Sequence, residues 1–300
     1  MSIAVSGLAL SVDRLTFGYG ASPVLEDVSL EILPGERVAI VGANGAGKTT
    51  LLKLMANLLS PQAGAVRLGD RDMRTVRRAE LATHLGMVPQ DLAVPFELTA
   101  RDLVECGRTA YLSWFRSLTA ADRRAVDDAL ASTDTTALSD RSLGELSGGE
   151  RQRAVIAMVL AQEPGIMLLD EPTQHLDLTR QGEILDLIAA LSRARGLTVV
   201  ATMHDLNLAA QYFDRLIVLG GRRLSADGPP SRVMRPDVLE AAYGGALDFV
   251  ATPERDVPIV LPARNAARQR SADLPVRQDA GLKACTTSGL RWATSSKERS

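Results

Sequence analysis

The sequence has few of the features that several protein classes require. Its 300 residues include only two cysteines, Cys106 and Cys285, which stand in no metal-ligand or redox spacing. We therefore expect free thiols in a reducing compartment. No uncharged apolar run reaches the roughly 18 residues that a membrane-spanning helix needs. Residues 1–10 lack the basic and apolar regions of a signal peptide, so any membrane role is expected to depend on a partner.

An excess of positive charge is also missing, which argues against nucleic acid as a partner. There are 34 Lys and Arg residues against 36 Asp and Glu residues, a formal net charge of −2. From position 251 onward nine basic and five acidic residues give +4, which leaves −6 for residues 1–250. Because 46% of the residues are hydrophobic and 23% are charged, the chain has enough apolar material for a full core.

The first part of the chain has the pattern of an α/β protein. Alternating apolar residues over 8–33 predict antiparallel strands, and the short apolar run 37–41 predicts a buried parallel strand. Leucines then recur at helical spacing over 51–59, up to Ser60 and Pro61. These patterns predict a strand over 37–41, then a glycine-rich loop, then a helix over 51–59.

The middle of the chain changes character, and the last part loses its pattern. We predict an inserted helical subdomain over about 91–160, with a helix near 121–131 that Thr119 caps. Residues 1–250 are expected to form one domain. Residues 251–300 are expected to form a C-terminal extension, mobile from about 263 because a sustained apolar period is lacking. The core is expected to continue with a helix over 149–162, a strand over 166–170, a helix over 179–195, a strand over 198–202 and a hairpin over 216–225.

The glycine-rich loop fits the phosphate-loop pattern G-x-x-x-x-G-K-[ST]. Glycines let the backbone wrap around phosphates and aim its N–H groups at them, and the next helix presents its positive N-terminus. Lys48 is expected to reach the β- and γ-phosphates, and the Thr49 hydroxyl to bind Mg²⁺. The expected nucleotide-binding residues are Gly42, Ala43, Asn44, Gly45, Ala46, Gly47, Lys48, Thr49 and Thr50.

Two consecutive carboxylates follow the apolar run 166–169. Asp170 at the end of this strand is suited to hold Mg²⁺ beside the phosphate loop, and Glu171 to polarise an attacking water. Taken alone, this pattern is more typical of a strand followed by a solvated turn. In a chain that also carries Lys48 in a phosphate loop, the catalytic interpretation is favoured.

The order of these motifs resembles the ATP-binding subunit of an ABC transporter, over roughly residues 8–250. The run Leu146-Ser147-Gly148-Gly149-Glu150 resembles the family signature. The resemblance implies the ABC ATPase fold, a P-loop NTPase core with an antiparallel β subdomain and an inserted helical subdomain. It also implies that Ser147, Gly148 and Gly149 contact the γ-phosphate of ATP bound to a second copy, so that ATP closes a dimer. The same residues suit a helix start with a capping box between Ser147 and Glu150.

Four further positions match the family. Tyr19 resembles the aromatic residue that stacks on adenine, and Gln90 the glutamine that contacts Mg²⁺ and water and couples to the membrane partner. Asp177 resembles the aspartate that crosses the dimer interface, and His204 the histidine that contacts the γ-phosphate. His175 stands where relatives often have a small residue. The implied catalytic residues are Glu171, His204, Lys48 and Gln90, and the implied metal ligands are Thr49, Gln90 and Asp170.

The resemblance also implies a biological role. It implies an ATP-hydrolysing, peripheral subunit at the cytoplasmic face of the inner membrane, working with polytopic permease subunits and, indirectly, with a periplasmic or lipid-anchored substrate-binding protein. Residues 98–108 and 111–115 resemble ATPases of the iron–siderophore, haem and vitamin B12 import group. Ferric siderophore is the favoured cargo, with haem and cobalamin left open.

Three alternatives remain at this stage. One is an importer of another cargo. A second is an ABC-type ATPase of DNA repair or translation, which the absence of long heptad repeats and of a second phosphate loop disfavours. A third is a non-hydrolysing regulatory module, against which the intact Lys48, Asp170, Glu171 and His204 argue.

Overall fold

The computed structural model describes residues 7–20, 22–92, 97–112, 117–251 and 256–263. They belong to one compact unit that extends to Ala263. The predictions for Trp114, Phe115, Cys285 and the tail from 264 lie outside the described residues. Within them, no helix is long and apolar enough to cross a membrane.

A small antiparallel sheet forms near the start of the chain, as the alternating pattern over 8–33 predicts. Apolar residues such as Leu10 and Val12 point into the core, while Ser11 and Asp13, which alternate with them along the strand, are more exposed. The sheet has the order β2-β1-β4-β5. Its strands are β1 (Leu10–Tyr19), β2 (Ser22–Ile32), β4 (Ala63–Leu68) and β5 (Arg71–Asp72).

The main sheet has six strands in the order β10-β9-β3-β8-β7-β6. All neighbouring strands run parallel except β10, which pairs antiparallel with β9. The predicted strands over 166–170 and 198–202 are confirmed as β7 and β8, and the predicted hairpin is formed by β9 and β10. The strands are β3 (Arg37–Gly42), β6 (Leu85–Val88), β7 (Ile166–Asp170), β8 (Thr198–Thr202), β9 (Arg215–Gly220) and β10 (Arg223–Gly228).

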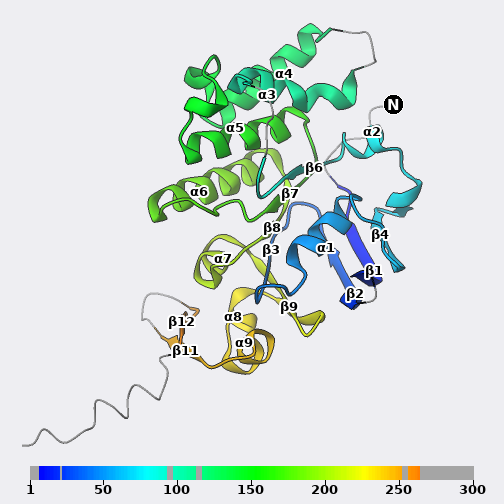
Figure 1. The fold of residues 1–300 in the computed structure, drawn as a ribbon, viewed down its shortest axis with the longest axis vertical. Helices are drawn as coiled ribbons and strands as arrows, with labels where there is room; N and C mark the ends of the chain where they lie inside the picture. The colour runs from blue at the N-terminus through cyan, green and yellow to red at the C-terminus, as the bar shows by residue number, and fades with distance from the viewer. Residues whose placement is uncertain (1–6, 21, 93–96, 113–116, 252–255, 264–300) are drawn as a thin grey trace, which may run out of the picture. The chain divides into compact units, whose positions relative to one another are not determined.

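Both faces of this sheet are covered by other elements. Successive side chains of a strand point to opposite faces, so each strand contributes side chains to two separate cores. On β3, Val38 and Ile40 join the core beneath α1 (Lys48–Met55) and the antiparallel sheet. Ala39 and Val41 join the core beneath α5 (Gly148–Ala161), α6 (Leu178–Arg195) and α7 (Leu206–Tyr212) on the other face. The central positions of the parallel strands are therefore apolar, as in parallel strands buried on both sides. Figure 1 shows α1 and the antiparallel sheet on one side of these strands and α5, α6 and α7 on the other.

The inserted segment is helical, as predicted, and α3, α4 and α5 pack together. Thr119 caps α4 through a capping box with Asp122, which confirms the predicted start of that helix. Ser147 and Glu150 form the capping box expected at α5. The longer helices are α1 (Lys48–Met55), α3 (Ala100–Cys106), α4 (Ala120–Ser132), α5 (Gly148–Ala161), α6 (Leu178–Arg195), α7 (Leu206–Tyr212) and α9 (Pro236–Tyr243). The shorter ones are α2 (Arg78–Leu81), α8 (Pro230–Val233) and the 3₁₀ turns Met73–Thr75, Gly107–Tyr111, Thr136–Leu138 and Leu143–Glu145.

The helix expected over 51–59 is placed differently. It begins at Lys48, directly after the glycine loop, and ends at Met55. Asn57 has φ 55°, in the left-handed region, and the N–H groups of Leu58 and Leu59 both donate to the Lys53 carbonyl. Asparagine tolerates this conformation and commonly ends helices in this way. The apolar spacing therefore continues past the residue that stops the helix.

The described chain ends in a short hairpin that crosses the boundary expected near residue 250. Strand β11 (Leu247–Val250) pairs antiparallel with β12 (Ile259–Pro262). Val260 is buried, and its backbone exchanges two hydrogen bonds with the Asn207 amide on α7. Residues after 250 thus contribute to the packed unit.

Candidate functional site

The loop after β3 needs glycine at two positions. Gly42 has φ 153°, and a Cβ there would lie 2.4 Å from the Leu219 carbonyl oxygen. Gly47 has φ 95°, and a Cβ there would lie 2.8 Å from Leu25 Cδ2. Backbone atoms of β9 cannot yield to a side chain at Gly42, so the loop can lie this close to the sheet only without one.

This loop ends at a helix N-terminus whose N–H groups are available. Gly47 occupies the N-cap position of α1, and no side chain caps the helix. The first N–H groups of a helix have no partner within it, and the helix dipole places positive partial charge there. The residues present therefore fit an anionic group such as a phosphate.

Lys48 lies folded over the same loop. The side chain is buried, and Nζ donates to the carbonyl oxygens of Gly42 at 3.0 Å and Ala43 at 3.3 Å. Burial lowers the pKa of Lys48 below its usual value, against the opposing charges of Glu171 and Asp170. An oxyanion in the cradle can replace the two carbonyl acceptors and favour the charged ammonium.

Asp170 joins the loop to the sheet. Its carboxylate is almost fully buried, and Oδ1 accepts hydrogen bonds from the hydroxyls of Thr49 at 2.9 Å and Thr202 at 2.7 Å. Carboxylate and hydroxyl oxygens are the ligands that Mg²⁺ prefers. Thr49 and Asp170 therefore fit the expected cation, since a hydroxyl that donates to a carboxylate keeps lone pairs for a metal.

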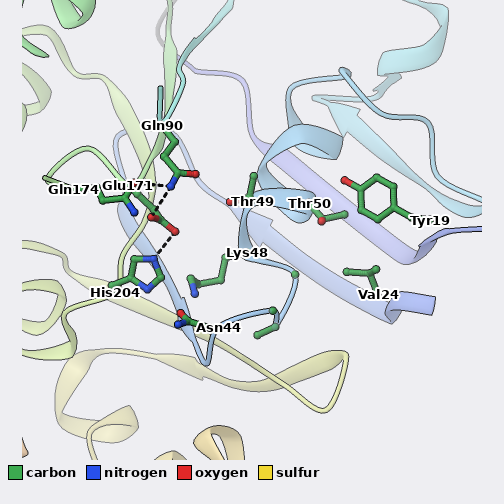
Figure 2. Close-up of a pocket in the computed structure, with 13 residues that line it drawn as sticks. Tyr19, Val24, Asn44, Lys48, Thr49, Thr50, Gln90, Glu171, Gln174 and His204 are labelled. Atoms are coloured by element: carbon green, nitrogen blue, oxygen red, sulfur yellow. Dashed lines mark hydrogen bonds and ion pairs between the residues drawn. The ribbon is translucent and has the colours of Figure 1, made fainter. Parts of the chain in front are cut away.

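Glu171 is held from two sides (Figure 2). His204 Nε2 lies 2.6 Å from Glu171 Oε1, and Gln90 Nε2 donates to Oε2 at 3.2 Å. Gln90 Nε2 also donates to Gln174 Oε1 at 2.5 Å. These groups follow β6, β7 and β8, whose carboxyl ends meet at one edge of the sheet. Glu171 itself has φ 50°, an uncommon backbone conformation for a residue with a side chain.

The loop and the carboxylate of Glu171 line one pocket of about 540 Å³. At its far end lies Tyr19, 59% exposed, which touches Phe17 in an edge-to-face arrangement with ring centroids 5.0 Å apart. An exposed ring in this place can stack on a planar group. The lining residues are Tyr19, Val24, Asn44, Gly45, Ala46, Gly47, Lys48, Thr49, Thr50, Gln90, Glu171, Gln174 and His204.

The predicted residues Gly42, Ala43 and Asp170 do not line the pocket themselves but are hydrogen-bonded to Lys48 or Thr49, which do. The predicted residues Ser147, Gly148, Gly149 and Asp177 lie elsewhere. Ser147 caps α5, and Asp177 caps α6 by accepting a hydrogen bond from the Arg180 N–H at 2.9 Å. These two helix starts adjoin, because a Cβ on Gly148 would lie 3.5 Å from Leu176 Cδ2, and one on Gly149 3.4 Å from Arg180 Cδ. They form a second surface, which we call the signature surface: Ser147, Gly148, Gly149 and Asp177.

Sequence reasoning missed three residues of the site. Val24 and Gln174 line the pocket, and Thr202 binds the carboxylate of Asp170. Gln174 lay beside the singled-out residues His175 and Asp177, but its partner Gln90 is 84 positions away. A threonine inside an apolar strand carries no local sign of such a role. His175 is exposed, with φ 62°, and does not line the pocket.

Comparison with known proteins gives consistent matches. Residues 25–174 match the family described as ABC transporter. The ferric enterobactin transport ATP-binding protein of Escherichia coli (strain K12) is 39% identical over 255 residues, 85% of this chain and 94% of that protein. The hemin import ATP-binding protein of Thermobifida fusca (strain YX) is 40% identical over 257 residues, 86% of this chain and 89% of that protein.

Among solved structures, a bacterial ABC transporter cassette determined as a dimer has a similar fold. It is 28% identical, with a TM-score of 0.64, and the match covers 73% of this chain and 98% of that one.

Proposed function

This chain belongs to the ABC transporter family and is an ABC-type ATPase coupled to transport; from that premise we propose that it powers an importer of ferric siderophore. The observation that carries the ATPase part of the proposal is the pocket that joins the phosphate loop to Glu171 and His204. Relatives that are named for ferric enterobactin and for hemin support iron-chelate cargo, with haem and cobalamin as the other candidates.

ATP binds along the pocket from Tyr19 to His204. The face of Tyr19 stacks on adenine, and the N–H groups at the start of α1 bind the phosphates. Lys48 Nζ moves from the carbonyls of Gly42 and Ala43 to the β- and γ-phosphates, exchanging two neutral acceptors for charged ones.

Thr49, Asp170 and Gln90 would hold Mg²⁺ beside these phosphates. The bound cation would neutralise part of the negative charge on the phosphate oxygens. Asp170 is suited to this because its buried carboxylate is already fixed by two hydroxyl donors.

Hydrolysis depends on the groups at the γ-phosphate end. A water oxygen attacks the γ-phosphorus, the bond from that phosphorus to the bridging oxygen breaks, and ADP and inorganic phosphate form. Glu171 orients the water and takes its proton, while His204 holds the carboxylate and contacts the γ-phosphate. The chain thus contributes mainly positioning and electrostatic stabilisation.

The signature surface acts on the ATP of a second copy. Its residues lie outside the pocket of their own chain, so each copy supplies half of a complete site. The dimer works with polytopic permease subunits at the cytoplasmic face of the inner membrane, as a peripheral component. A periplasmic or lipid-anchored binding protein delivers the cargo to that permease.

Two substitutions test this proposal. Lys48→Ala removes the ammonium from the phosphates, so ATP turnover should be lost. Glu171→Gln should keep ATP binding but stop hydrolysis, so that the dimer accumulates with ATP and Mg²⁺ and elutes earlier in size-exclusion chromatography.

The control is Glu31→Gln, the same change at an exposed position on β2. It should leave both turnover and elution unchanged. Normal turnover by Lys48→Ala would refute the phosphate-loop assignment, and a monomeric Glu171→Gln protein in saturating ATP would refute the dimer.

A further inference from the structure

A single buried hydroxyl connects the two consecutive carboxylate residues of the site. Thr202 is fully buried at the end of β8, directly opposite Asp170 in the neighbouring strand. Its hydroxyl donates to Asp170 Oδ1 at 2.7 Å and accepts the backbone N–H of Glu171 at 2.8 Å. A hydroxyl has one proton to give and lone pairs to accept with, so both capacities serve adjacent residues of β7 and the turn after it.

We propose that Thr202 is a positioning residue for ATP hydrolysis, which fixes the side chain of Asp170 and the backbone of Glu171 relative to each other. The inference rests on the proposed function, because it assigns Thr202 a part in that same reaction. Thr202 does not line the pocket, so it acts only through the two acidic residues.

The effect on Asp170 is to fix its rotation. Oδ1 receives two hydroxyl protons, one from Thr49 at the start of α1 and one from Thr202 on β8. With both donors present, the carboxylate plane is held between the loop and the sheet. Without the Thr202 hydroxyl, Asp170 Oδ1 keeps only the hydrogen bond from Thr49, and Thr49 is itself an expected metal ligand.

The effect on Glu171 is to hold an uncommon backbone conformation. Glu171 has φ 50°, which persists only where surrounding contacts enforce it. The hydrogen bond from its N–H to Thr202 ties this turn to the neighbouring strand. Loss of that bond would let the peptide relax and move the carboxylate away from His204 and Gln90.

The alternative is that Thr202 only satisfies buried polar groups. The same strand provides a matched comparison, because Thr198 at the other end of β8 is also buried. Its Oγ1 accepts a backbone N–H, from Gly35 at 2.9 Å. The two threonines share residue type, strand, burial and backbone contact, but only Thr202 also binds the carboxylate of Asp170.

The test compares Thr202→Val with Thr198→Val, each of which replaces a hydroxyl by a methyl group. ATP turnover gives kcat and KM, and thermal unfolding gives stability. Affinity for Mn²⁺ in the presence of a non-hydrolysable ATP analogue is measured by electron paramagnetic resonance. For Thr202→Val we expect kcat to fall about tenfold or more, Mn²⁺ to bind more weakly and KM for ATP to change little.

Thr198→Val should lose similar thermal stability while it keeps wild-type kcat and Mn²⁺ affinity. A second pair, Thr202→Ser and Thr202→Ala, differs by the hydroxyl alone and serves if the valine variant does not fold. The serine variant should recover most of the turnover that the alanine variant loses.

Equal kcat and Mn²⁺ affinity in Thr202→Val and Thr198→Val, or in the serine and alanine variants, would overturn the inference. The proposed function would survive that outcome, since the wild-type protein would still hydrolyse ATP. Absence of ATP hydrolysis by the wild-type protein would instead refute the proposed function.

Discussion

Polar groups of the candidate site bind one another. Lys48 Nζ donates to Gly42 and Ala43, and Glu171 receives contacts from His204 and Gln90. Burial without any partner would cost each of these groups more than a hydrogen bond returns. ATP binding is therefore an exchange of hydrogen bonds, which favours phosphate because it offers charged acceptors.

Tyr243 is a residue beneath this loop whose hydroxyl has no such partner. Its Oη is buried and makes no hydrogen bond to the described residues. Burial raises the pKa of Tyr243 to about 12. An unpartnered buried hydroxyl is destabilising, so its removal should cost little.

We predict that Tyr243→Phe is as stable as the wild-type protein at pH 8, or more stable by about 1 kcal/mol. Between pH 10 and pH 12 the unfolded tyrosine loses its proton while the folded one keeps it. The wild-type protein therefore loses stability as pH rises through this window, by about 1 kcal/mol at pH 11. Urea unfolding at pH 8 and pH 11 measures both proteins, and an equal loss in both would contradict the prediction.

Individual elements differ in how far their own residues define them. Helix α4 begins where Thr119 and Asp122 form a capping box, and β7 and β8 coincide with short apolar runs. Helix α1 departs from its apolar period, because the backbone at Asn57 turns left-handed. The hairpin β11–β12 has weak sequence signals and is held by contacts to α7.

We predict that the folded protein needs this hairpin for its stability but does not need the residues after it. A chain ending at residue 251 loses β12, the burial of Val260 and two hydrogen bonds with Asn207. It should be less stable than the chain of residues 1–263 by about 2–4 kcal/mol in urea unfolding. The chain 1–263 should match the full-length protein in stability and nearly match it in ATP turnover.

The two truncations test different statements. Equal stability of the chains 1–251 and 1–263 would contradict the contribution of β12. A large loss of turnover in the chain 1–263 would contradict the expectation that residues 264–300 are dispensable for hydrolysis.

At the scale of the whole molecule, the chain carries two separate parts of the proposed ATPase site, the pocket and the signature surface. The pocket is the proposed site for one ATP, and the signature surface lies outside it. A single copy should therefore hydrolyse ATP poorly until a second copy supplies Ser147 and its glycines. In the proposed importer the permease and the binding protein contact the cargo, so we expect residues of this pocket not to determine what is imported.

The imported cargo can be identified only by measuring transport with the whole assembly. We predict that a strain without this gene loses uptake of ferric siderophore, because no ATP hydrolysis then drives the permease. Uptake of radiolabelled ferric siderophore, haem and cobalamin is compared, with the wild-type gene and the Lys48→Ala gene returned on a plasmid. The wild-type gene should restore siderophore uptake and the variant should not. Normal siderophore uptake with loss of haem or cobalamin uptake would reassign the cargo.

The sequence by itself determined those features that depend only on interactions between residues close together in the chain. The glycine loop, the apolar strands β7 and β8, and the caps at Thr119 and Ser147 each depend on residues within a few positions of one another. Resemblance to the family then supplied the expected roles of residues such as Gln90 and His204. The six-stranded sheet agrees with the α/β fold that these patterns predict.

Only the tertiary structure decided which side chains meet. Thr202 binds Asp170 across 32 positions, Gln90 binds Gln174 across 84, and Asn207 binds Val260 across 53. No period of 2 or 3.6 residues encodes such pairs, because they arise where strand ends and loops converge. For the same reason, the contact between the starts of α5 and α6 became visible only once the chain was folded.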